Sequence, residues 1–297
     1  MVIPSVVVGR GDFFFRFVNN ILLNYLFWYF SRFIPVMKVH LNLTIIFLFS
    51  ILFTNAQDIF PPPLKPNMVF TGGENLVYQI RYGFIVGGYT TFSLSEELYA
   101  GKPVYHASAV GETSGIANTL FGVKDIYESW FDKESYLPYK QIRNIKEGHY
   151  IKYNEVTYDR KNNTVNSKLS GVHKVPEKIL DLTSTFYYIR RVDFSKLKED
   201  DVILINMYFD DEIFPFRLRY KGMEGIKTKF GTISCFKICP VVEVGRMFKD
   251  PDDLTIWFSD DDNRVPLLVK MDIRIVGSVL LKLISYKNSF NQMDFLE

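Results

Sequence analysis

The sequence predicts an all-β fold, mainly antiparallel, in which a large curved sheet or open barrel wraps around one central helix. Two patterns carry this prediction. Between residues 71 and 287, apolar and polar residues alternate with period two in short segments, and turn residues separate these segments about every ten positions, a spacing typical of β-sandwiches and barrels. The segment 176–191 has helical spacing instead. Because an open sheet exposes two edges, this sheet is expected to close or to cover them.

The first half of the domain is predicted to be an antiparallel meander with one solvated face. Alternate residues from Leu76 to Tyr82 fall on one face of its first strand. Glycines at positions 83, 87 and 88, and the turn Gly101–Pro103, separate the strands that follow. The expected strands are 74–82, 89–99, 104–110, 123–132, 139–146, 150–158 and 164–169.

The segment 176–191 is predicted to be the central helix. Pro176 suits a first helical turn, and Arg190 and Arg191 suit the negative end of the helix dipole. The residues expected to form its buried apolar stripe are Ile179, Leu182, Phe186 and Ile189. Phe186→Ala should then cost about 3–5 kcal/mol, whereas Arg190→Ala should cost little. The alternative is a mobile lid whose apolar face contacts a ligand.

Strand patterning resumes after this helix and continues almost to the C-terminus. The expected strands are 202–209, 214–220, 226–229, 234–241, 254–259, 265–273 and 276–286. Together with the first half they form a single predicted domain over residues 71–287, followed by a tail over residues 288–297. The 241 residues from 57 to 297 suit one large β domain or two small ones, and the continuous strand pattern favours one.

The N-terminal region carries an export signal. Residues 37–56 combine a short basic start at Lys38, an apolar run from Thr44 to Phe53, and small or short residues before a cut at Ala56–Gln57. The apolar run is too short to span a bilayer. We therefore expect a cleaved signal peptide, no stable transmembrane anchor after cleavage, and a periplasmic or envelope-associated protein.

The segments on either side of the signal are less regular. Residues 1–36 are either an extension upstream of a true start at Met37 or an additional hydrophobic segment. Residues 57–70 form a proline-rich arm, which is expected to be extended and loose.

Charge and cysteine usage exclude several classes of function. Removing residues 1–56 takes away four basic residues and one acidic residue, so the formal net charge falls from +2 to −1. A chain without basic excess is an unlikely nucleic-acid binder. Cys235 and Cys239 lie four positions apart, about 13 Å in a strand, which is too far for a disulfide. We expect two buried thiols, and neither a metal nor another cofactor, since the histidines lack metal-ligand spacing.

Five long segments then show a family resemblance. They are GENLVYQIRYGFIVGG, VKDIYESWFDKESYLPYKQIRNIKEG, DLTSTFYYIR, FDDEIFPFRLRY and GRMFKDPDDLTIWFSDDDNRVPLLV. In this order they resemble an exported bacterial family, the domain of unknown function numbered 3108, over about residues 70–287. The resemblance implies an exported β-rich domain in Gram-negative bacteria, and it implies no activity or catalytic residue.

Two shorter segments are similar to periplasmic lipoprotein carriers. Each has an aromatic strand, an acidic turn and a proline that opens the next strand: Tyr127–Asp132 before Pro138, and Ile256–Ser259 before Pro266. In such carriers a curved half-barrel holds a helix and an apolar cavity for acyl chains. The similarity therefore implies a lipid or lipoprotein ligand.

Three functions remain open, and binding is favoured over catalysis because no nucleophile, phosphate-loop or metalloprotease motif is present. Aromatic side chains could line a β-sheet cavity for a hydrophobic or glycan ligand: Tyr82, Tyr127, Trp130, Phe186 and Trp257. Their alternative role is core packing. A glycan-active hydrolase or lyase would instead use loop carboxylates: Asp210, Asp253 and Asp260. The third function is a structural role in envelope assembly.

Two further groups of residues are candidate sites. The turn Asp260–Asn263 either binds Ca²⁺ or is a solvated hairpin turn. A catalytic set could combine Tyr127, Arg143, His149 and Tyr150, but the sequence places only Arg143 and His149 near one turn.

Overall fold

The computed structural model describes residues 58–65, 69–242, 244, 247–274, 277–289 and 291. The expectations for residues 1–57, which include the signal peptide and its cleavage site, lie outside the described residues. So do most of the predicted tail and part of the proline-rich arm.

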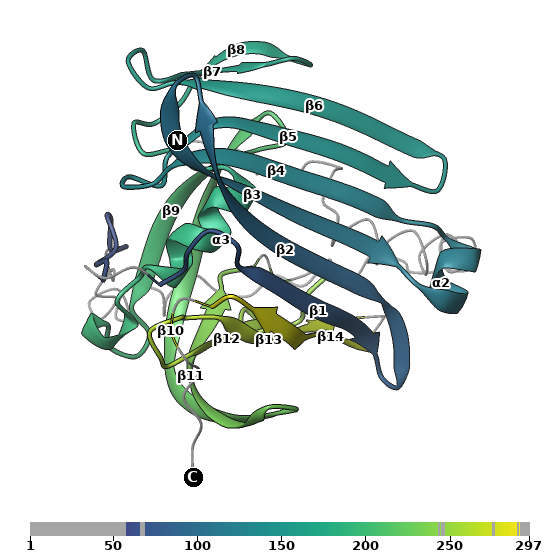
Figure 1. Ribbon diagram of the computed structural model, residues 1–297. Helices are drawn as coiled ribbons and strands as arrows, with labels where there is room; N and C mark the ends of the chain where they lie inside the picture. Colours follow the sequence, from purple (N-terminus) through teal and green to yellow (C-terminus); the bar gives the residue numbers. More distant parts are fainter. Residues whose placement is uncertain are drawn as a thin grey trace, which may run out of the picture.

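Fourteen strands of the described residues form one antiparallel sheet (Figure 1). The strands of the first half are β1 (Asn75–Tyr82), β2 (Ile85–Tyr99), β3 (Lys102–Thr113), β4 (Lys124–Asp132), β5 (Pro138–Glu147), β6 (Tyr150–Asp159), β7 (Thr164–Ser167) and β8 (Gly171–Lys174). The strands of the second half are β9 (Val202–Phe209), β10 (Glu212–Thr228), β11 (Gly231–Pro240), β12 (Leu254–Ser259), β13 (Pro266–Ile273) and β14 (Gly277–Lys287).

The sheet curves strongly but does not close into a barrel. Each strand pairs with its sequence neighbour from β1 to β8 and again from β9 to β14, and β1 pairs with β14. The two edges are therefore β8 and β9, which are consecutive in the chain. The prediction of an all-β, antiparallel fold is confirmed. The strands form one curved sheet with two free edges, and this sheet is not closed into a barrel.

The strand predictions hold best where the alternation is clean. Segments 202–209 and 254–259 match β9 and β12. Two predicted strands, 214–220 and 226–229, are one long strand, β10, because a bulge between Tyr220 and Met223 interrupts the alternation without ending the strand. The four-residue strand β8 and the six-residue helix α2 (Gly115–Leu120) were not predicted.

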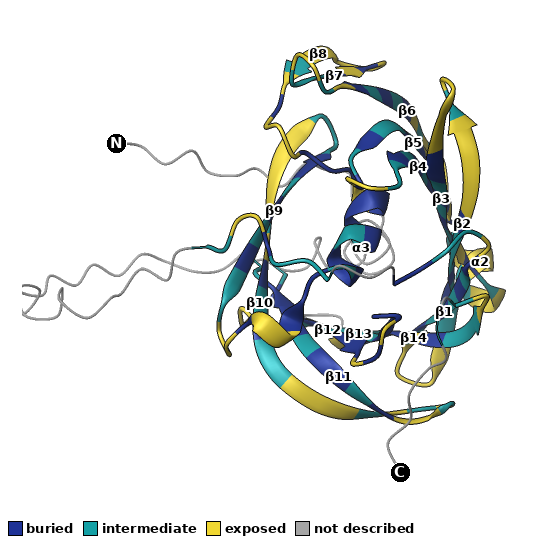
Figure 2. Cartoon of the chain, turned by 60° about the vertical axis from the view of Figure 1, so that its left-hand side comes forward, coloured by how far each residue is buried: buried dark blue, intermediate teal, exposed yellow. Residues whose placement is uncertain are grey.

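Helix α3 (Leu182–Arg190) lies on the concave side of the curved sheet (Figure 2). It begins at Leu182 rather than at Pro176 because Asp181 is its N-cap. The Asp181 carboxylate accepts the Ser184 N–H at 2.7 Å, and the Ser184 hydroxyl accepts the Asp181 N–H at 3.0 Å, which is a capping box. The preceding residue, Leu180, is extended and forms a bridge with Met207 of β9. A single 3₁₀ turn, η1 (Phe194–Lys196), follows the helix.

The burial predicted for this segment is wrong for Leu182 of the stripe and for Arg190, while Ile179 is buried but precedes the helix. Leu182 is 39% exposed, whereas Arg190, expected at a polar end, is fully buried. Ile189 is buried and Phe186 is half-buried. The stripe assumed one solvated face, but α3 is enclosed on several sides, so its polar residues are buried as well.

Two extended segments pair with the free edge of β9. Leu180 N–H donates to Asn206 O at 2.9 Å, and Ile59 N–H donates to Val202 O at 2.8 Å. Residues 58–65 therefore lie against the sheet, and the expectation of a loose arm is wrong for them. The uncovered N–H and C=O groups of an edge strand favour such pairing.

The hairpin formed by β10 and β11 is long enough to curl back over the sheet. Figure 2 shows it running beneath β12, β13 and β14. Its tip residues Ile226 and Phe230 pack in one cluster with Trp257 and Leu268. This part of the molecule therefore has a second layer, on the face of the sheet opposite to α3.

Candidate functional site: a basic groove under the hairpin

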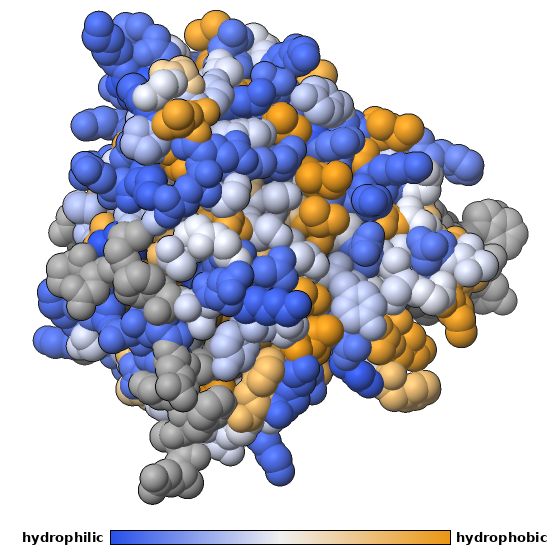
Figure 3. Space-filling model, in the orientation of Figure 1, coloured by the Kyte–Doolittle hydropathy of each residue, from blue (hydrophilic) through white to orange (hydrophobic). Residues whose placement is uncertain are grey.

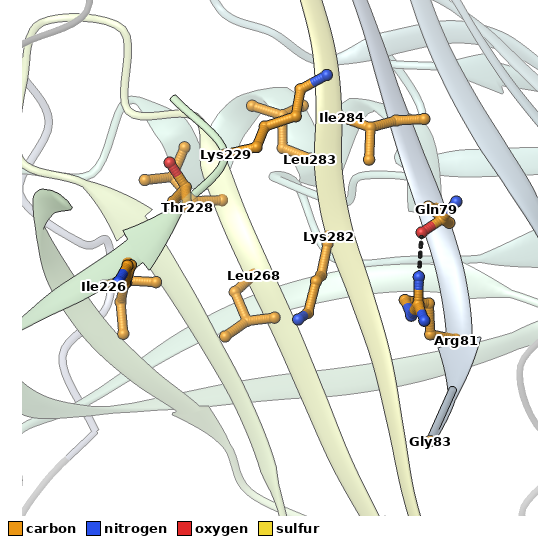
Figure 4. Close-up of a pocket in the computed structure, with 12 residues that line it drawn as sticks. Gln79, Arg81, Gly83, Ile226, Thr228, Lys229, Leu268, Lys282, Leu283 and Ile284 are labelled. Carbon is orange, nitrogen blue, oxygen red and sulfur yellow. Dashed lines mark hydrogen bonds between the residues drawn. The ribbon is translucent and has the colours of Figure 1, made fainter. Parts of the chain in front are cut away.

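A groove of about 550 Å³ lies between the tip of the β10–β11 hairpin and strands β1, β13 and β14 (Figure 4). Its lining residues are Gln79, Arg81, Gly83, Ile226, Lys227, Thr228, Lys229, Leu267, Leu268, Lys282, Leu283 and Ile284. Four of them are basic, none is acidic, and five are aliphatic. The groove therefore combines positive charge with an apolar wall.

The period-two alternation of the strands explains which side chains face this groove. In β1, Leu76, Tyr78 and Ile80 are buried on the side of α3, so Gln79 and Arg81 between them point to the opposite face. Gln79 pairs with Lys282 of β14, and Lys282 pairs with Leu268 of β13. Directly paired residues share a face. The sequence therefore places Gln79, Lys282 and Leu268 in one row on the outer face.

The cations of the groove differ in how firmly they are held. The Arg81 guanidinium donates to Gln79 Oε1 at 3.0 Å and to the backbone oxygen of Phe84 at 3.0 Å, which fixes it against the β1–β2 turn. Lys229 lies over the Phe230 ring at 5.0 Å. Lys227 and Lys282 have no ion-pair partner among the described residues. Two ammonium groups thus remain available to an anion.

Two of the five predicted aromatic residues lie beside this groove. Trp257 pairs with Leu268 in the same row, and its indole N–H donates to Glu224 Oε2 at 3.0 Å. It is almost fully covered by the hairpin. Tyr82 follows Arg81 at the end of β1 and is half exposed. Trp257 and Tyr82 are thus neighbours of groove-lining residues, but none of the five predicted aromatic residues lines the groove itself.

The other three lie elsewhere. Phe186 stacks on Phe92 on the concave side of the sheet, with ring centroids 4.1 Å apart. Tyr127 is buried on the concave side, where the Arg143 guanidinium lies 5.6 Å from its ring. Trp130 is on the outer face of β4, stacked on His106 at 4.1 Å. The five aromatic residues therefore do not line one surface, and their role in ligand binding stays a prediction.

Asp210 belongs to a structural contact across the open side of the sheet. Asp210 and Asp211 are the two central residues of the β9–β10 turn, with φ of +52° and +66°, a type I′ hairpin. Arg143 of β5 donates to Asp210 Oδ1 at 2.7 Å, and Lys152 of β6 contacts the same oxygen. Asn154 of β6 donates to Asp211 at 3.2 Å. We call this group, Arg143, Lys152, Asn154, Asp210 and Asp211, the clasp.

The clasp carboxylate is held in its charged form. Burial alone would raise the pKa of Asp210, but the hydrogen bond from Lys152 and the charge of Arg143 lower it below the ordinary value. Of the candidate catalytic residues, Arg143 donates its hydrogen bond to Asp210 in the clasp. His149 is exposed at the β5–β6 turn.

The other two predicted carboxylates do not form a pair. Asp253 and Asp260 flank the six residues of β12, which separates them by about 23 Å at 3.3 Å per residue. Paired carboxylates in glycosidases lie about 5–10 Å apart. In the β12–β13 turn, Asp261 accepts the backbone N–H groups of Asn263 and Arg264. Within the described ranges, no group of three His, Cys, Asp or Glu side chains is placed to hold a metal.

The centre of the molecule contains a buried ion pair. The Arg190 guanidinium donates to Glu74 Oε1 at 2.5 Å and Oε2 at 2.8 Å, and both side chains are fully buried. Its remaining N–H groups donate to the backbone oxygens of Val69 and Asn263. Arg190 therefore joins α3 to the N-terminal end of β1 and to the β12–β13 turn.

Asp181 is a second buried charge near α3. Burial raises its pKa to about 6, although hydrogen bonds from Ser129 and Ser184 oppose this shift. Because Asp181 caps the helix, we assign it a structural role.

The prediction of two buried thiols is confirmed. Cys235 and Cys239 are free, buried and on β11, so the segment is a regular strand. Burial raises the pKa of the Cys235 thiol to about 12, which makes it a poor nucleophile at neutral pH.

Sequence reasoning missed the basic groove, because its four cations come from two separate strands, β1 and β14, and from one hairpin tip. A weak signal exists, since Lys227 and Lys229 alternate in the predicted strand 226–229 and Lys282 lies in an otherwise apolar strand. Only the curl of the hairpin brings them together.

Comparison with solved structures gives one fold-level likeness. A β-barrel-like protein of the DUF1849 family from Brucella abortus aligns with a TM-score of 0.51 at 8% identity, over 74% of this chain and 99% of that chain. A DUF1089 family protein from Pseudomonas aeruginosa aligns at 0.33 and 8% identity, over 62% and 90% of the two chains. A Bacteroides fragilis protein, described as a candidate exported protein with a YmcC-like fold, aligns at 0.28 and 9% identity, over 76% and 99%. Only the first of these likenesses bears on the fold.

No curated protein matches the chain significantly. Among the described residues, no helix is long and apolar enough to cross a membrane. The similarity to lipoprotein carriers stays a prediction.

The family model for proteins of unknown function DUF3108 matches residues 77–284. Because this match covers most of the sequence, the chain belongs to the DUF3108 family.

Proposed function

We propose that this protein is an exported binding protein for an amphipathic anion, which it holds in the groove between the β10–β11 hairpin and strands β1, β13 and β14. One observation supports this: the groove is lined by four cations and five aliphatic residues, and by no acid. A phosphate or carboxylate group would contact Lys227 and Lys282, and an alkyl chain would lie against Leu268 and Ile284. Lipids and lipid-linked glycans have this chemistry.

The charge pattern favours an anionic head group over a neutral sugar. A neutral glycan is usually held by exposed aromatic faces and polar side chains, whereas Trp257 is covered by the hairpin. Hydrogen bonds from ammonium groups to an anion are about twice as strong as neutral ones. Because the lysines are exposed to solvent, their contribution should weaken as salt increases.

The export signal in residues 37–56 supports a location in the envelope, where anionic amphiphiles are abundant. Sequencing the N-terminus of the exported protein tests this step. A first residue at Gln57 is the expected result, and a mature chain that starts near Met1 contradicts export by cleavage.

Calorimetric titration with dodecyl phosphate, kept below its micellar concentration, tests the groove. Lys282→Gln should weaken binding about tenfold, or about 1.4 kcal/mol. Lys161→Gln is the matched control, since Lys161 is an exposed lysine in the β6–β7 turn. Dodecyl maltoside and inorganic phosphate separate the contributions of chain and charge. Equal affinity for the maltoside, or a Lys282→Gln variant that binds like the wild type, would contradict the proposal.

A further inference from the structure

Large apolar side chains are exposed on three successive connections at one end of the sheet. Phe84 in the β1–β2 turn is 89% exposed. Ile116 and Leu120 of α2, and Ile151 after the β5–β6 turn, are between 70% and 77% exposed. Figure 3 shows hydrophobic side chains on the right-hand side, where Figure 1 places α2 and the β1–β2 turn. We call these four residues the apolar end.

Backbone hydrogen bonds hold the three connections beside one another. Ser114 N–H, just before α2, donates to Gly87 O of β2 at 3.0 Å. Gly148 N–H of the β5–β6 turn donates to Gly122 O, just after α2, at 2.8 Å. The exposed residues therefore lie at one end of the molecule, on or beside three neighbouring connections.

The solvent-facing charges around this end are mainly positive, and two further acids there, Asp125 and Glu147, are buried. Lys124 and Lys146 are exposed at the ends of β4 and β5, and Arg81 is held against the Phe84 backbone. Glu112, paired in register with Lys124, is an exposed acid at the same place. The buried carboxylate of Asp125 accepts the Lys146 backbone N–H at 2.9 Å and does not reach solvent.

We infer that the apolar end docks on the surface of an anionic lipid bilayer. A few large apolar side chains beside basic residues can enter the interfacial layer of a bilayer, as amphipathic surfaces do, whereas a specific protein partner needs a buried interface of about 1,000 Å² or more. Basic residues behind them complement anionic head groups. The occupant is therefore a membrane surface that carries negative charge.

The position of the groove agrees with this orientation. Arg81 and Gly83 line the groove, and Phe84 is the next residue along the chain. A docked molecule would thus present this end of the groove to the bilayer. This last step rests on the proposed function, whereas docking itself does not.

Vesicle co-sedimentation of the exported protein tests the inference. Binding to phosphatidylglycerol vesicles should exceed binding to phosphatidylcholine vesicles, and the pair Phe84→Asp and Leu120→Asp should reduce it at least tenfold. Leu98→Asp is the matched control, since Leu98 is 74% exposed in the β2–β3 hairpin at the opposite end of β2. A Phe84→Trp variant should show a blue-shifted emission with vesicles, and a Leu98→Trp variant should not.

Each outcome bears on one proposal. Loss of vesicle binding with unchanged dodecyl phosphate affinity in the Phe84→Asp, Leu120→Asp protein supports docking independently of the groove. If Lys282→Gln impairs only dodecyl phosphate binding, the two sites are separate. Absence of binding to either vesicle type, or an equal loss in Leu98→Asp, overturns the inference. So does a Phe84→Trp emission shift that follows protein concentration without lipid, since it would indicate self-association.

Discussion

Arg190 occupies the last turn of α3, where a cation usually faces solvent and interacts with the helix dipole. Here the guanidinium points inward and forms a bidentate ion pair with Glu74. Burial disfavours the charge, but the carboxylate of Glu74 raises the pKa of Arg190 above its ordinary value. The pair is fully desolvated, so each member depends on the other.

We predict that Arg190→Ala is strongly destabilising, by about 3–5 kcal/mol, because it leaves a buried carboxylate without its partner. The sequence alone predicts only a small loss of stability for this substitution. Urea unfolding measures the difference. Lys196→Ala, on an exposed lysine of the following turn, should change stability by less than about 1 kcal/mol. Equal costs for the two variants would contradict the central role of the ion pair.

At the scale of elements, α3 differs from an ordinary surface helix. Thr183, Ser184, Tyr187 and Arg190 are buried along with Ile189, so the helix has no polar solvated side. Ser184 and Arg190 form hydrogen bonds, whereas the Tyr187 side chain is held by aromatic packing. Tyr187 packs edge-on against Phe70 with ring centroids 4.9 Å apart.

Two neighbouring residues of α3 therefore make a sharp comparison. Tyr187 is fully buried, and Tyr187→Ala should cost about 3–5 kcal/mol. Phe186 is only half-buried, so Phe186→Ala should cost less, about 2 kcal/mol. The apolar stripe read from the sequence predicts the opposite order. Thermal melts of both variants decide between the two, and a Phe186→Ala protein as stable as the wild type would favour the mobile-lid alternative.

At the scale of the whole molecule, the open side between β8 and β9 is closed by side chains rather than by a strand ladder. The clasp joins the β9–β10 turn to β5 and β6 through Asp210 and Asp211. Tyr208 of β9 packs in one cluster with Val156, Tyr158 and Val165 of β6 and β7. Contacts of this kind can separate without breaking the sheet.

We predict that Asp210→Ala opens this side locally. Hydrogen exchange should become faster in β9 and in β7–β8, and stay unchanged in β1 and β14. Because the pKa of Asp210 is lowered in the folded state, its contribution is present above its unfolded pKa of about 3.9 and is lost as the pH falls through the folded value.

The stability difference between wild type and Asp210→Ala should therefore be clear at pH 6 and shrink below about pH 4. Asp159→Ala is the control, since Asp159 is exposed at the end of β6 and accepts backbone N–H groups of the β6–β7 turn. This substitution should leave hydrogen exchange in β1 and β9 unchanged. Faster exchange throughout the sheet would contradict a local opening.

Local sequence patterns were sufficient to predict most strands and turns. Alternation located most strands, turn residues separated them, and the spacing of Cys235 and Cys239 excluded an internal disulfide within a strand. These features depend on residues within one strand or turn, so a single segment contains the information. The family could also be identified from the sequence, because the resemblance depends on contiguous segments.

Contacts between distant segments could be read only from the three-dimensional structure. The burial of Arg190 depends on Glu74, which is 116 positions away, and the clasp depends on residues 58 and 67 positions apart. The basic groove depends on the curl of one hairpin over three strands. No local pattern encodes these contacts, because burial of a charged side chain is determined by the partner that the fold brings to it.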